Sequence, residues 1–289
     1  MKKSVLCASI LACLLLAGCG SKSEWSVLKQ MPTPDGGASF YAGFYDQNLG
    51  ISVGEHGLIS ATSDGGSNWG KAENSSLCRF CLDIVDERTA WSGGNGGHVR
   101  VTKDGGKTWQ GVTDCKLGAV HRSIDFIDDK NGWVANEFYI ASTNDGGDTW
   151  NKMKNPKLKG KILSVSILSS EEGYVMNKAG ELLYTRDGGE TWTCTPIPEL
   201  QAETSGGEIL ACDFNFYDSQ RGEAVASIIK EDGAGIVFLA TEDGGATWKA
   251  CNIEYPKEDV ASEVYFSSNG NYITLTSVKK DMTVYKRNC

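Results

Sequence analysis

The amino-acid sequence predicts an all-β fold, a six-bladed β-propeller closed by its N-terminal strand. Three observations carry this prediction. One turn motif recurs five times, the segments between its copies divide into short strands, and the two ends of the chain complete each other. A seven-bladed ring is the alternative, and it is less favoured because no residues remain for another blade.

The repeated motif reads TSDGGSNW, TKDGGKTW, TNDGGDTW, TRDGGETW and TEDGGATW, and its aspartates are 40, 41, 42 and 56 residues apart. Aspartate in a turn accepts hydrogen bonds from backbone amides two or three residues on, and glycine adopts positive φ without steric cost. Threonine and tryptophan favour the flanking strands. Each copy therefore predicts a hairpin tip, and the residues given this structural role are Asp64, Trp69, Asp104, Trp109, Asp145, Trp150, Asp187, Trp192, Asp243 and Trp248.

Each segment between two copies shows three short β-like runs, as in FYDQNLGISVGEHGLISATSDGG. A fourth strand follows each tryptophan, so a unit has strands A, B, C and D. The unit ending at 241–248 is longer, and we expect its extra residues in a longer B–C loop. After Trp248 the chain supplies only strands A, B and C, whereas EWSVLKQMP at the start resembles a separate strand D headed by Trp25. Pairing the two ends would close the ring and leave no open sheet edge.

The first nineteen residues predict export and lipidation. Lys2 and Lys3 precede an apolar run about half as long as the ~20 residues that span a bilayer, which indicates a signal peptide. Residues 16–19, LAGC, resemble the bacterial lipobox, which implies cleavage before Cys19 and acylation of that cysteine. An ordinary secretory signal with an accidental cysteine is the alternative. We therefore expect a signal peptide at 1–18, a lipidated tether at 19–23 and a single propeller domain at 24–289, held on the outer leaflet of the cytoplasmic membrane or on an outer membrane of a bacterial cell envelope.

The charge of the chain argues against a nucleic-acid partner. The net charge is -9, and it becomes -11 once Lys2 and Lys3 are removed. Phosphate binding relies on clustered cations, which this composition does not favour. We expect no cofactor.

The motif T-x-D-G-G-x-x-W resembles the Asp-box, or bacterial neuraminidase repeat, and the accompanying F-x-D-x-x-x-G pattern is similar to photosystem II assembly and stability factor propellers. This resemblance implies that the repeated turns lie away from the usual binding face, which carries the B–C loops and the D–A linkers. The candidate binding face then includes Glu55, His56, Asn95, His98, His121 and Arg122. Glu137 and Lys178 fall in the B–C loops of later blades.

Two kinds of side chain on this face suggest further chemistry. The three histidines fit either a metal or acid–base cluster or, more simply, solvent-exposed loop residues. Cys78 or Cys81 is a candidate for a disulfide to Cys115 in an oxidising compartment, with unpaired thiols and a zinc site that adds His121 as alternatives. The basic linker KMKNPKLKGK (152–161) is either a solvated surface or a contact for an acidic partner or for lipid headgroups.

The preferred function is a lipid-anchored, non-catalytic binding, scaffold or assembly module for a protein or surface glycan. The alternative is a sialidase-like or other glycoside hydrolase, because those enzymes share Asp-boxes. Sialidases need three converging arginines, but the chain has only seven, one of which, Arg186, lies inside a repeated turn. Catalysis is therefore not expected.

Overall fold

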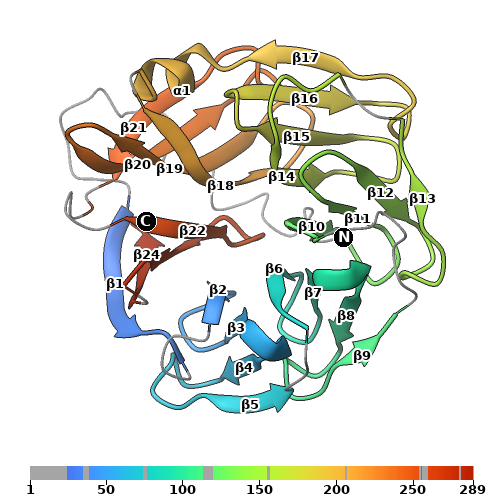
Figure 1. Cartoon of the computed structure of the whole chain (residues 1–289), viewed down its shortest axis with the longest axis vertical. Coiled ribbons are helices and arrows are strands. Elements are labelled where there is room, and N and C mark those ends of the chain that lie inside the picture. The colour runs from blue at the N-terminus through green and yellow to red at the C-terminus, as the bar shows by residue number, and fades with distance from the viewer. Residues whose placement is uncertain are drawn as a thin grey trace.

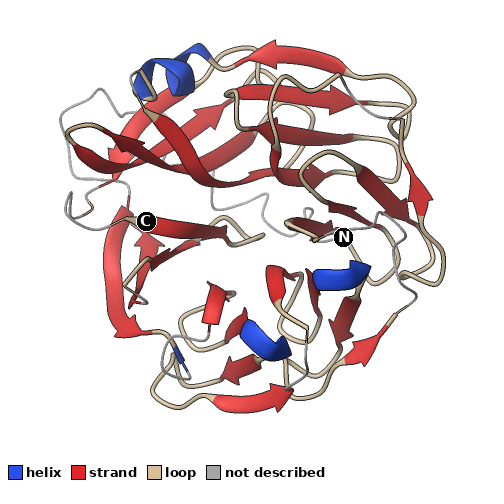
Figure 2. Cartoon of the chain, viewed as in Figure 1, coloured by secondary structure: helices blue, strands red, loops and turns tan. Residues whose placement is uncertain are grey.

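Six four-stranded antiparallel sheets surround a central axis (Figures 1 and 2), in a computed structural model that describes residues 25–34, 39–73, 77–112, 120–154, 157–205, 207–253, 255, 260–279 and 281–288. The first strand of each unit lies near the axis and the fourth lies at the rim. The predicted fold class, a six-bladed β-propeller, is confirmed.

Blade 1 contains β2 (Ser39–Phe44), β3 (Gly50–Gly54), β4 (Ile59–Thr62) and β5 (Gly70–Glu73); blade 2 contains β6 (Arg79–Ile84), β7 (Ala90–Gly94), β8 (Val99–Thr102) and β9 (Gln110–Gly111). Blade 3 contains β10 (Ser123–Phe126), β11 (Gly132–Ala135), β12 (Ile140–Thr143) and β13 (Asn151–Lys152); blade 4 contains β14 (Ile162–Ile167), β15 (Gly173–Asn177), β16 (Glu181–Thr185) and β17 (Thr193–Pro196). Blade 5 contains β18 (Glu208–Phe216), β19 (Gly222–Lys230), β20 (Gly233–Thr241) and β21 (Lys249–Ile253); blade 6 contains β22 (Ala261–Phe266), β23 (Tyr272–Ser277), β24 (Asp281–Arg287) and β1 (Trp25–Pro32).

Only one α-helix, α1 (Pro198–Glu203), occurs in the described part of the chain, and it precedes blade 5. The 3₁₀ turns η3 (Glu55–Gly57) and η4 (Asn95–Gly97) connect strands B and C of blades 1 and 2. Among the residues placed by the structure, no helix has the length and apolar character needed to cross a membrane.

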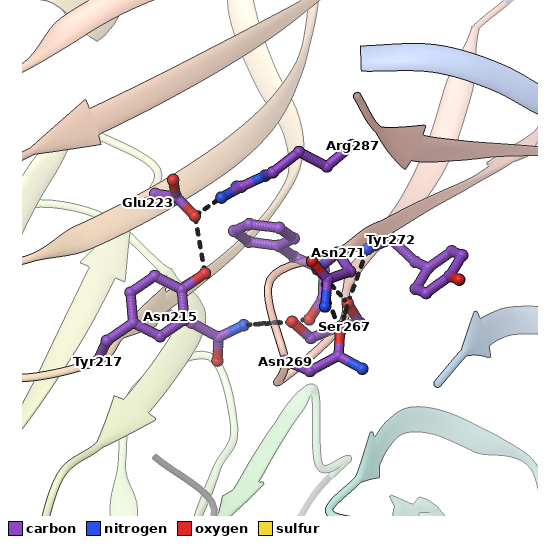
Figure 3. A network of polar contacts seen from close by, with 9 residues as sticks. Asn215, Tyr217, Glu223, Ser267, Asn269, Asn271, Tyr272 and Arg287 are labelled. Carbon is purple, nitrogen blue, oxygen red and sulfur yellow. Dashed lines mark hydrogen bonds and ion pairs between the residues drawn. The ribbon is translucent and has the colours of Figure 1, made fainter. Parts of the chain in front are cut away.

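The N-terminal strand β1 closes the ring by pairing with the C-terminal strand β24. Trp25 pairs with Arg287 at one end and Pro32 with Asp281 at the other. An ion pair between Arg287 Nη2 and Glu223 Oε2, 2.6 Å apart, joins this blade to blade 5, and the Tyr217 hydroxyl donates to the same carboxylate oxygen (Figure 3). Both charged side chains are at least nine-tenths buried, so a buried polar contact fixes blade 6 to blade 5 beside the strand pair that closes the ring.

Each repeated turn connects strands C and D and is held by its own side chains. In the second copy Thr102 Oγ1 donates to Asp104 Oδ1, and the backbone N–H and hydroxyl of Thr108 donate to the two Asp104 oxygens at 2.9 and 2.6 Å. The amide partner lies four residues after the aspartate, not two or three as expected, because the two glycines extend the turn. Both glycines have positive φ, 74° and 87°. The turn is therefore closed locally, without a ligand.

The same turn also contacts the A–B loop of its own blade and the outer part of the preceding blade. The N–H of the first glycine donates to a carbonyl of the A–B loop in the same blade, as from Gly105 to Arg88 at 2.9 Å. The second glycine packs against the preceding blade, since a Cβ at Gly106 would lie 2.9 Å from the Cβ of Ala61. The conformation and the close approach both require glycine.

The apolar core lies between blades, and one tryptophan from each blade covers a cluster shared with the preceding blade. Trp150 meets Phe126 edge-on at 6.3 Å in the cluster between blades 2 and 3. Trp25 occupies the equivalent place between blades 5 and 6, where its ring lies 6.0 Å from that of Phe266. Trp25 therefore acts as the tryptophan of the sixth unit, although no repeated turn precedes it.

Side chains of the inner strands also connect neighbouring blades. Asp83 Oδ2 accepts from the N–H of Phe126 in the next blade at 2.9 Å, and Asp125 Oδ2 accepts from Ile167 at 2.7 Å. The same kind of bond joins the later blades. Ser166 Oγ of blade 4 accepts from the N–H of Phe216 in blade 5, and Asp213 Oδ2 of blade 5 accepts from the N–H of Phe266 in blade 6. These bonds occupy N–H groups on the inner sheet edges, where strands would otherwise lack partners.

Blade 1 has glycine where its neighbours carry these polar side chains. A Cβ at Gly43 would lie 2.4 Å from the ring of Tyr265, so the missing side chain makes room for this tyrosine of blade 6. The Tyr265 hydroxyl passes blade 1 and accepts from the N–H of Ile84 in blade 2 at 3.3 Å. These hydrogen bonds between inner strands therefore run from blade 2 through blades 3, 4 and 5 to blade 6, and Tyr265 connects blade 6 to blade 2.

Candidate functional site

The antiparallel order of the strands divides the connections between two faces. We call the face formed by the A–B loops and the repeated C–D turns the turn face, and the face formed by the B–C loops and the D–A linkers the loop face. A cavity of about 210 Å³ opens on the loop face at the central axis. We call it the funnel, and it is lined by Tyr41, Phe80, Arg122, Ser123, Glu137, Lys161, Ile162, Leu163, Ser164, Lys178, Leu210, Ala211, Cys212, Ser262, Glu263 and Val264.

All six inner strands contribute to this cavity, because each begins at the loop face. Tyr41 comes from β2, Phe80 from β6, Leu163 from β14 and Leu210 from β18. The inner strands are the edge strands of their sheets. A chain entering the funnel would therefore meet aromatic and aliphatic side chains beside the edges of the inner strands, some of whose backbone groups are already bonded between blades.

The mouth of the funnel carries charges of both signs. Lys161 Nζ lies 2.8 Å from Glu137 Oε2, and the Lys178 ammonium group lies 3.0 Å from Glu208 Oε2. The exposed guanidinium of Arg122 lies over the ring of Phe80, with Cζ 4.8 Å from the ring centroid. Such a stacked guanidinium keeps its N–H groups available for an acceptor.

Asp213 lies deeper, where β18 faces the axis. Its carboxylate accepts from Ser164 Oγ at 2.8 Å, from the N–H of Phe266 at 2.9 Å and from its neighbour Phe214 at 3.0 Å. Burial raises the pKa of Asp213 to about 7, and repulsion from the nearby Asp125 carboxylate raises it further. The three hydrogen bonds favour the ionised form and lower the pKa, but they do not outweigh burial. Asp213 is not itself part of the funnel lining, but it directly follows the lining residue Cys212 on β18.

The predicted binding-face residues separate into three environments. Arg122 lines the funnel. Glu55 and His56 are exposed in η3, and Asn95 and His98 are partly exposed in and after η4, on the loop face but outside the funnel lining. His121 is fully buried.

The buried position of His121 corrects the expectation that it is exposed on the binding face. Its backbone N–H donates to the Gly94 carbonyl at 3.1 Å, which draws the linker against blade 2. A Cβ at Gly93 would lie 3.1 Å from the Cβ of His121, so the absence of a side chain there accommodates it. The described residues contain no cluster of three or more His, Cys, Asp or Glu side chains placed to hold a metal.

The predicted disulfide stays a prediction, because Cys115 lies outside the described residues. Among the described cysteines, Cys78, Cys81, Cys194 and Cys212 form no disulfide with one another. Burial raises the pKa of the Cys81 thiol to about 12, which opposes formation of a reactive thiolate.

The basic linker between blades 3 and 4 is extensively paired. Lys154 forms an ion pair with Glu190, Lys159 with Glu181 and Lys161 with Glu137. Lys152 lies over the Tyr139 ring, with Nζ 3.4 Å from the centroid. Because acids of the same chain compensate three of its charges, the linker is a solvated surface more than a free basic patch.

The sequence interpretation missed most of the funnel because it looked for function in loops. Tyr41, Phe80, Leu163 and Glu263 lie in inner strands, which sequence alone reads as core. Their shared position was available as a signal, since all four precede the last residue of strand A by three or four positions.

The sequence of the chain matches one family of known proteins. A family model described as photosynthesis system II assembly factor YCF48 matches residues 111–288. The chain belongs to this family. None of the curated proteins matches the chain in sequence.

Solved structures share the fold at low sequence identity. A structure titled "YCF48 bound to D1 peptide" is 15% identical, with a TM-score of 0.57 over 92% of this chain and 96% of that chain. YCF48 from Cyanidioschyzon merolae is 16% identical, with a TM-score of 0.52 over 91% and 99%. A virginiamycin B lyase from Staphylococcus aureus reaches a TM-score of 0.60 at 10% identity, over 91% and 99%. At these identities the likeness shows the fold alone.

Proposed function

We propose that this protein is a non-catalytic binding module of the bacterial cell envelope, anchored by lipid at Cys19, that receives an extended protein segment in the funnel during assembly of a membrane complex. Membership of the YCF48 family supports an assembly role, and one structural relative has a peptide bound, as its title says. The observation that carries the proposal is the funnel itself, where six strand edges meet beside aromatic, aliphatic and charged side chains.

The mixed lining suits a polypeptide better than a uniformly charged ligand. A peptide presents backbone donors and acceptors, apolar side chains and charges, and the funnel has a counterpart for each. Phe138 and Val278, which are 50% and 55% exposed, add apolar surface in B–C loops of the same face. A surface glycan remains the second partner class.

The glycoside hydrolase alternative receives no support from the placement of the arginines. All seven lie in the described part of the chain, and Arg122 alone lines the funnel. Arg88, Arg186 and Arg221 belong to the turn face, and Arg287 is paired with Glu223 between blades 5 and 6. The lining of this cavity therefore offers one guanidinium rather than the three converging ones that a sialidase uses.

Photo-crosslinking tests the proposal in detergent-solubilised membranes. A photoreactive residue replacing Leu163 in the funnel should capture a discrete polypeptide segment, identifiable by mass spectrometry, while the same residue at Gln47 on the turn face should not. Arg122→Glu should reduce the yield about tenfold or more, and Lys107→Glu on the turn face should leave it unchanged. Hydrolysis of a fluorogenic glycoside panel, or equal capture at both positions, would contradict the proposal.

A further inference from the structure

We infer that the anchor orients the propeller with its turn face toward the membrane, so that the funnel opens toward the aqueous compartment and takes a segment that approaches from that side. This inference rests on the lipid anchor of the proposed function. It concerns the direction in which the site faces, which the fold itself determines through the position of β1.

Strand β1 begins at the turn face. Its first residue, Trp25, pairs with Arg287, whose N–H donates to the carbonyl of Asn271 in the A–B loop of blade 6 at 3.0 Å. Its last residue, Pro32, pairs with Asp281, the first residue after the B–C loop on the loop face. The tether that precedes Trp25 is therefore attached at the turn-face end of the outermost strand of blade 6.

This attachment point is fixed in the fold. Trp25 is 4% exposed and packs against Phe238 and Phe266, with ring centroids 5.6 and 6.0 Å away. The Arg287 guanidinium lies over the indole at 4.9 Å and is held by Glu223. The tether is therefore attached to a residue that is packed into the core between blades 5 and 6, and not to a loose end of the chain.

The tether is too short for the opposite orientation. Six residue steps separate Cys19 from Trp25, which reach at most about 20 Å when fully extended. The eight-residue strand β1 rises about 23 Å from one face toward the other. To bring the loop face to the bilayer, the tether would have to run along all of β1 and past the loops beyond it, which exceeds its reach.

Exposed apolar side chains support contact at the same corner. Val27 and Leu28 are 50% and 39% exposed, and they lie two and three residues after the attachment point. A register shift occurs between Val27 and Lys29, so Leu28 has no partner residue on β24. Apolar side chains beside a lipid tether can enter the boundary between headgroups and acyl chains. The other two large apolar side chains exposed in the described residues, Phe138 and Val278, lie on the loop face.

The remainder of the turn face is strongly acidic and would not adhere to anionic lipid. Its loops and turns carry sixteen acidic and six basic side chains, counted over 45–49, 63–68, 85–89, 103–108, 127–131, 144–149, 168–172, 186–191, 217–221, 242–247 and 267–271. Repulsion from anionic headgroups acts over a screening length of about 8 Å at physiological ionic strength. Contact with the bilayer is thus confined to the corner at β1, and the short reach of the tether, acting against this repulsion, is what keeps the turn face on the membrane side.

Energy transfer to labelled lipids measures the orientation. The lipidated full chain is placed in vesicles of phosphatidylethanolamine and phosphatidylglycerol with an acceptor on the headgroups. A donor is attached either at Gln47 or at Glu55, which are exposed on opposite faces of blade 1. Transfer should be clearly greater from Gln47, and equal or greater transfer from Glu55 would overturn the inference.

Two further variants identify the cause. Twenty Gly/Ser residues inserted between Ser23 and Glu24 should largely remove the difference between the two donors, because a flexible linker of this length spans about 25 Å on average. Val27→Ser combined with Leu28→Ser should reduce the difference while leaving vesicle binding intact. A difference that persists unchanged in both variants would refute the role of the tether and the corner.

The inference and the proposed function fail in different ways. A native chain that does not associate with vesicles, like a Cys19→Ser control, would overturn the anchor and the orientation together. Crosslinking at Leu163 in detergent does not need the anchor, so it would still report on the funnel.

Discussion

The aspartate of each repeated turn stabilises the fold through bonds made entirely within its own motif. Sequence reasoning predicted a structural role for these aspartates, because five identical residues spread around a ring cannot serve one substrate. It misplaced the amide partner, which lies four residues on, since the pair of positive-φ glycines adds residues to the turn. The chemistry of a residue was thus readable from the repeat, whereas the geometry of its hydrogen bonds was not.

Replacing Asp104 by alanine should lower the free energy of unfolding by about 1–2 kcal/mol, because the bonds from Thr102 and Thr108 are lost. These bonds, led by that from the Thr108 hydroxyl, lower the pKa of Asp104 to about 2. The carboxylate therefore contributes stability above pH 4, and this contribution is lost as the pH falls from about 4 through 2. Urea unfolding of both proteins between pH 7 and pH 2 should show the difference shrinking in acid. The exposed Lys103→Ala variant is the control, and an equal loss there would contradict the assignment.

Asp213 should have the opposite pH dependence. Its pKa in the folded chain is about 7, above the usual 3.8, so the unfolded chain releases this proton at lower pH. Ionisation consequently costs folding stability as the pH rises from about 4 through 7. Asp213→Asn cannot ionise, so its stability should rise relative to the native protein over this range. Denaturation curves at pH 5, 6, 7 and 8 test this, and a relative stability that does not change with pH would refute it.

At the scale of elements, the repeat predicted the number and order of strands but not their extent. The longer fifth unit was expected to have a longer B–C loop. Instead β19 and β20 are nine residues each, and only Glu231 and Asp232 separate them. The run AVASIIK and its partner GIVFLA favour strands, and an antiparallel pair extends while its side chains can pack. Extra residues between two turn motifs were therefore wrongly attributed to a loop.

Trp25 shows where an element was identified from one residue. Its alignment with the tryptophans of the repeats predicted that β1 belongs to the last blade, and the structure confirms it. Trp25→Ala should lower the free energy of unfolding by about 3–5 kcal/mol, because it removes a buried indole from the cluster between blades 5 and 6. Val27→Ala on the exposed side of the same strand should cost less than about 0.5 kcal/mol. Chemical denaturation of the two variants compares them, and similar losses would argue against a specific role for the indole.

At the scale of the whole molecule, ring closure was predictable and the funnel was not. Ring closure follows from the number of strands, because the three strands after Trp248 and the one strand that begins at Trp25 together make a four-stranded blade. The funnel depends on which inner-strand residues converge at the axis, and residues as distant in sequence as Tyr41 and Val264 meet there through a hydrogen bond of 2.7 Å. Periodicity does not reveal such convergence. Burial of His121, caused by a linker that pairs with the neighbouring blade, was hidden for the same reason.

A circular permutant tests whether the pairing of the N-terminal strand β1 with β24 limits the rate at which the ring opens. The ends of β24 and β1 lie side by side, with Ser26 Oγ donating to Asn288 Oδ1 at 2.7 Å, so a T-x-D-G-G-x-x-W turn can join them. Opening the chain between β1 and β2 then makes every blade from contiguous residues. The permutant should fold and retain the funnel, but it should unfold about tenfold faster or more, because opening the ring between blades 6 and 1 no longer breaks the seven residue pairs of β1 and β24.

A second permutant supplies the matched control. It carries the same joining turn but is opened at Glu55–Gly57, between β3 and β4, so that blade 1 is assembled from both ends of the chain. Opening its ring again requires separation of paired strands, in this case β3 from β4, and slow unfolding should be retained. Unfolding rates from urea jumps followed by tryptophan fluorescence distinguish the three chains. If the first permutant unfolds as slowly as the second, packing between blades alone limits opening, and the terminal strand is a connection rather than the closure of the ring.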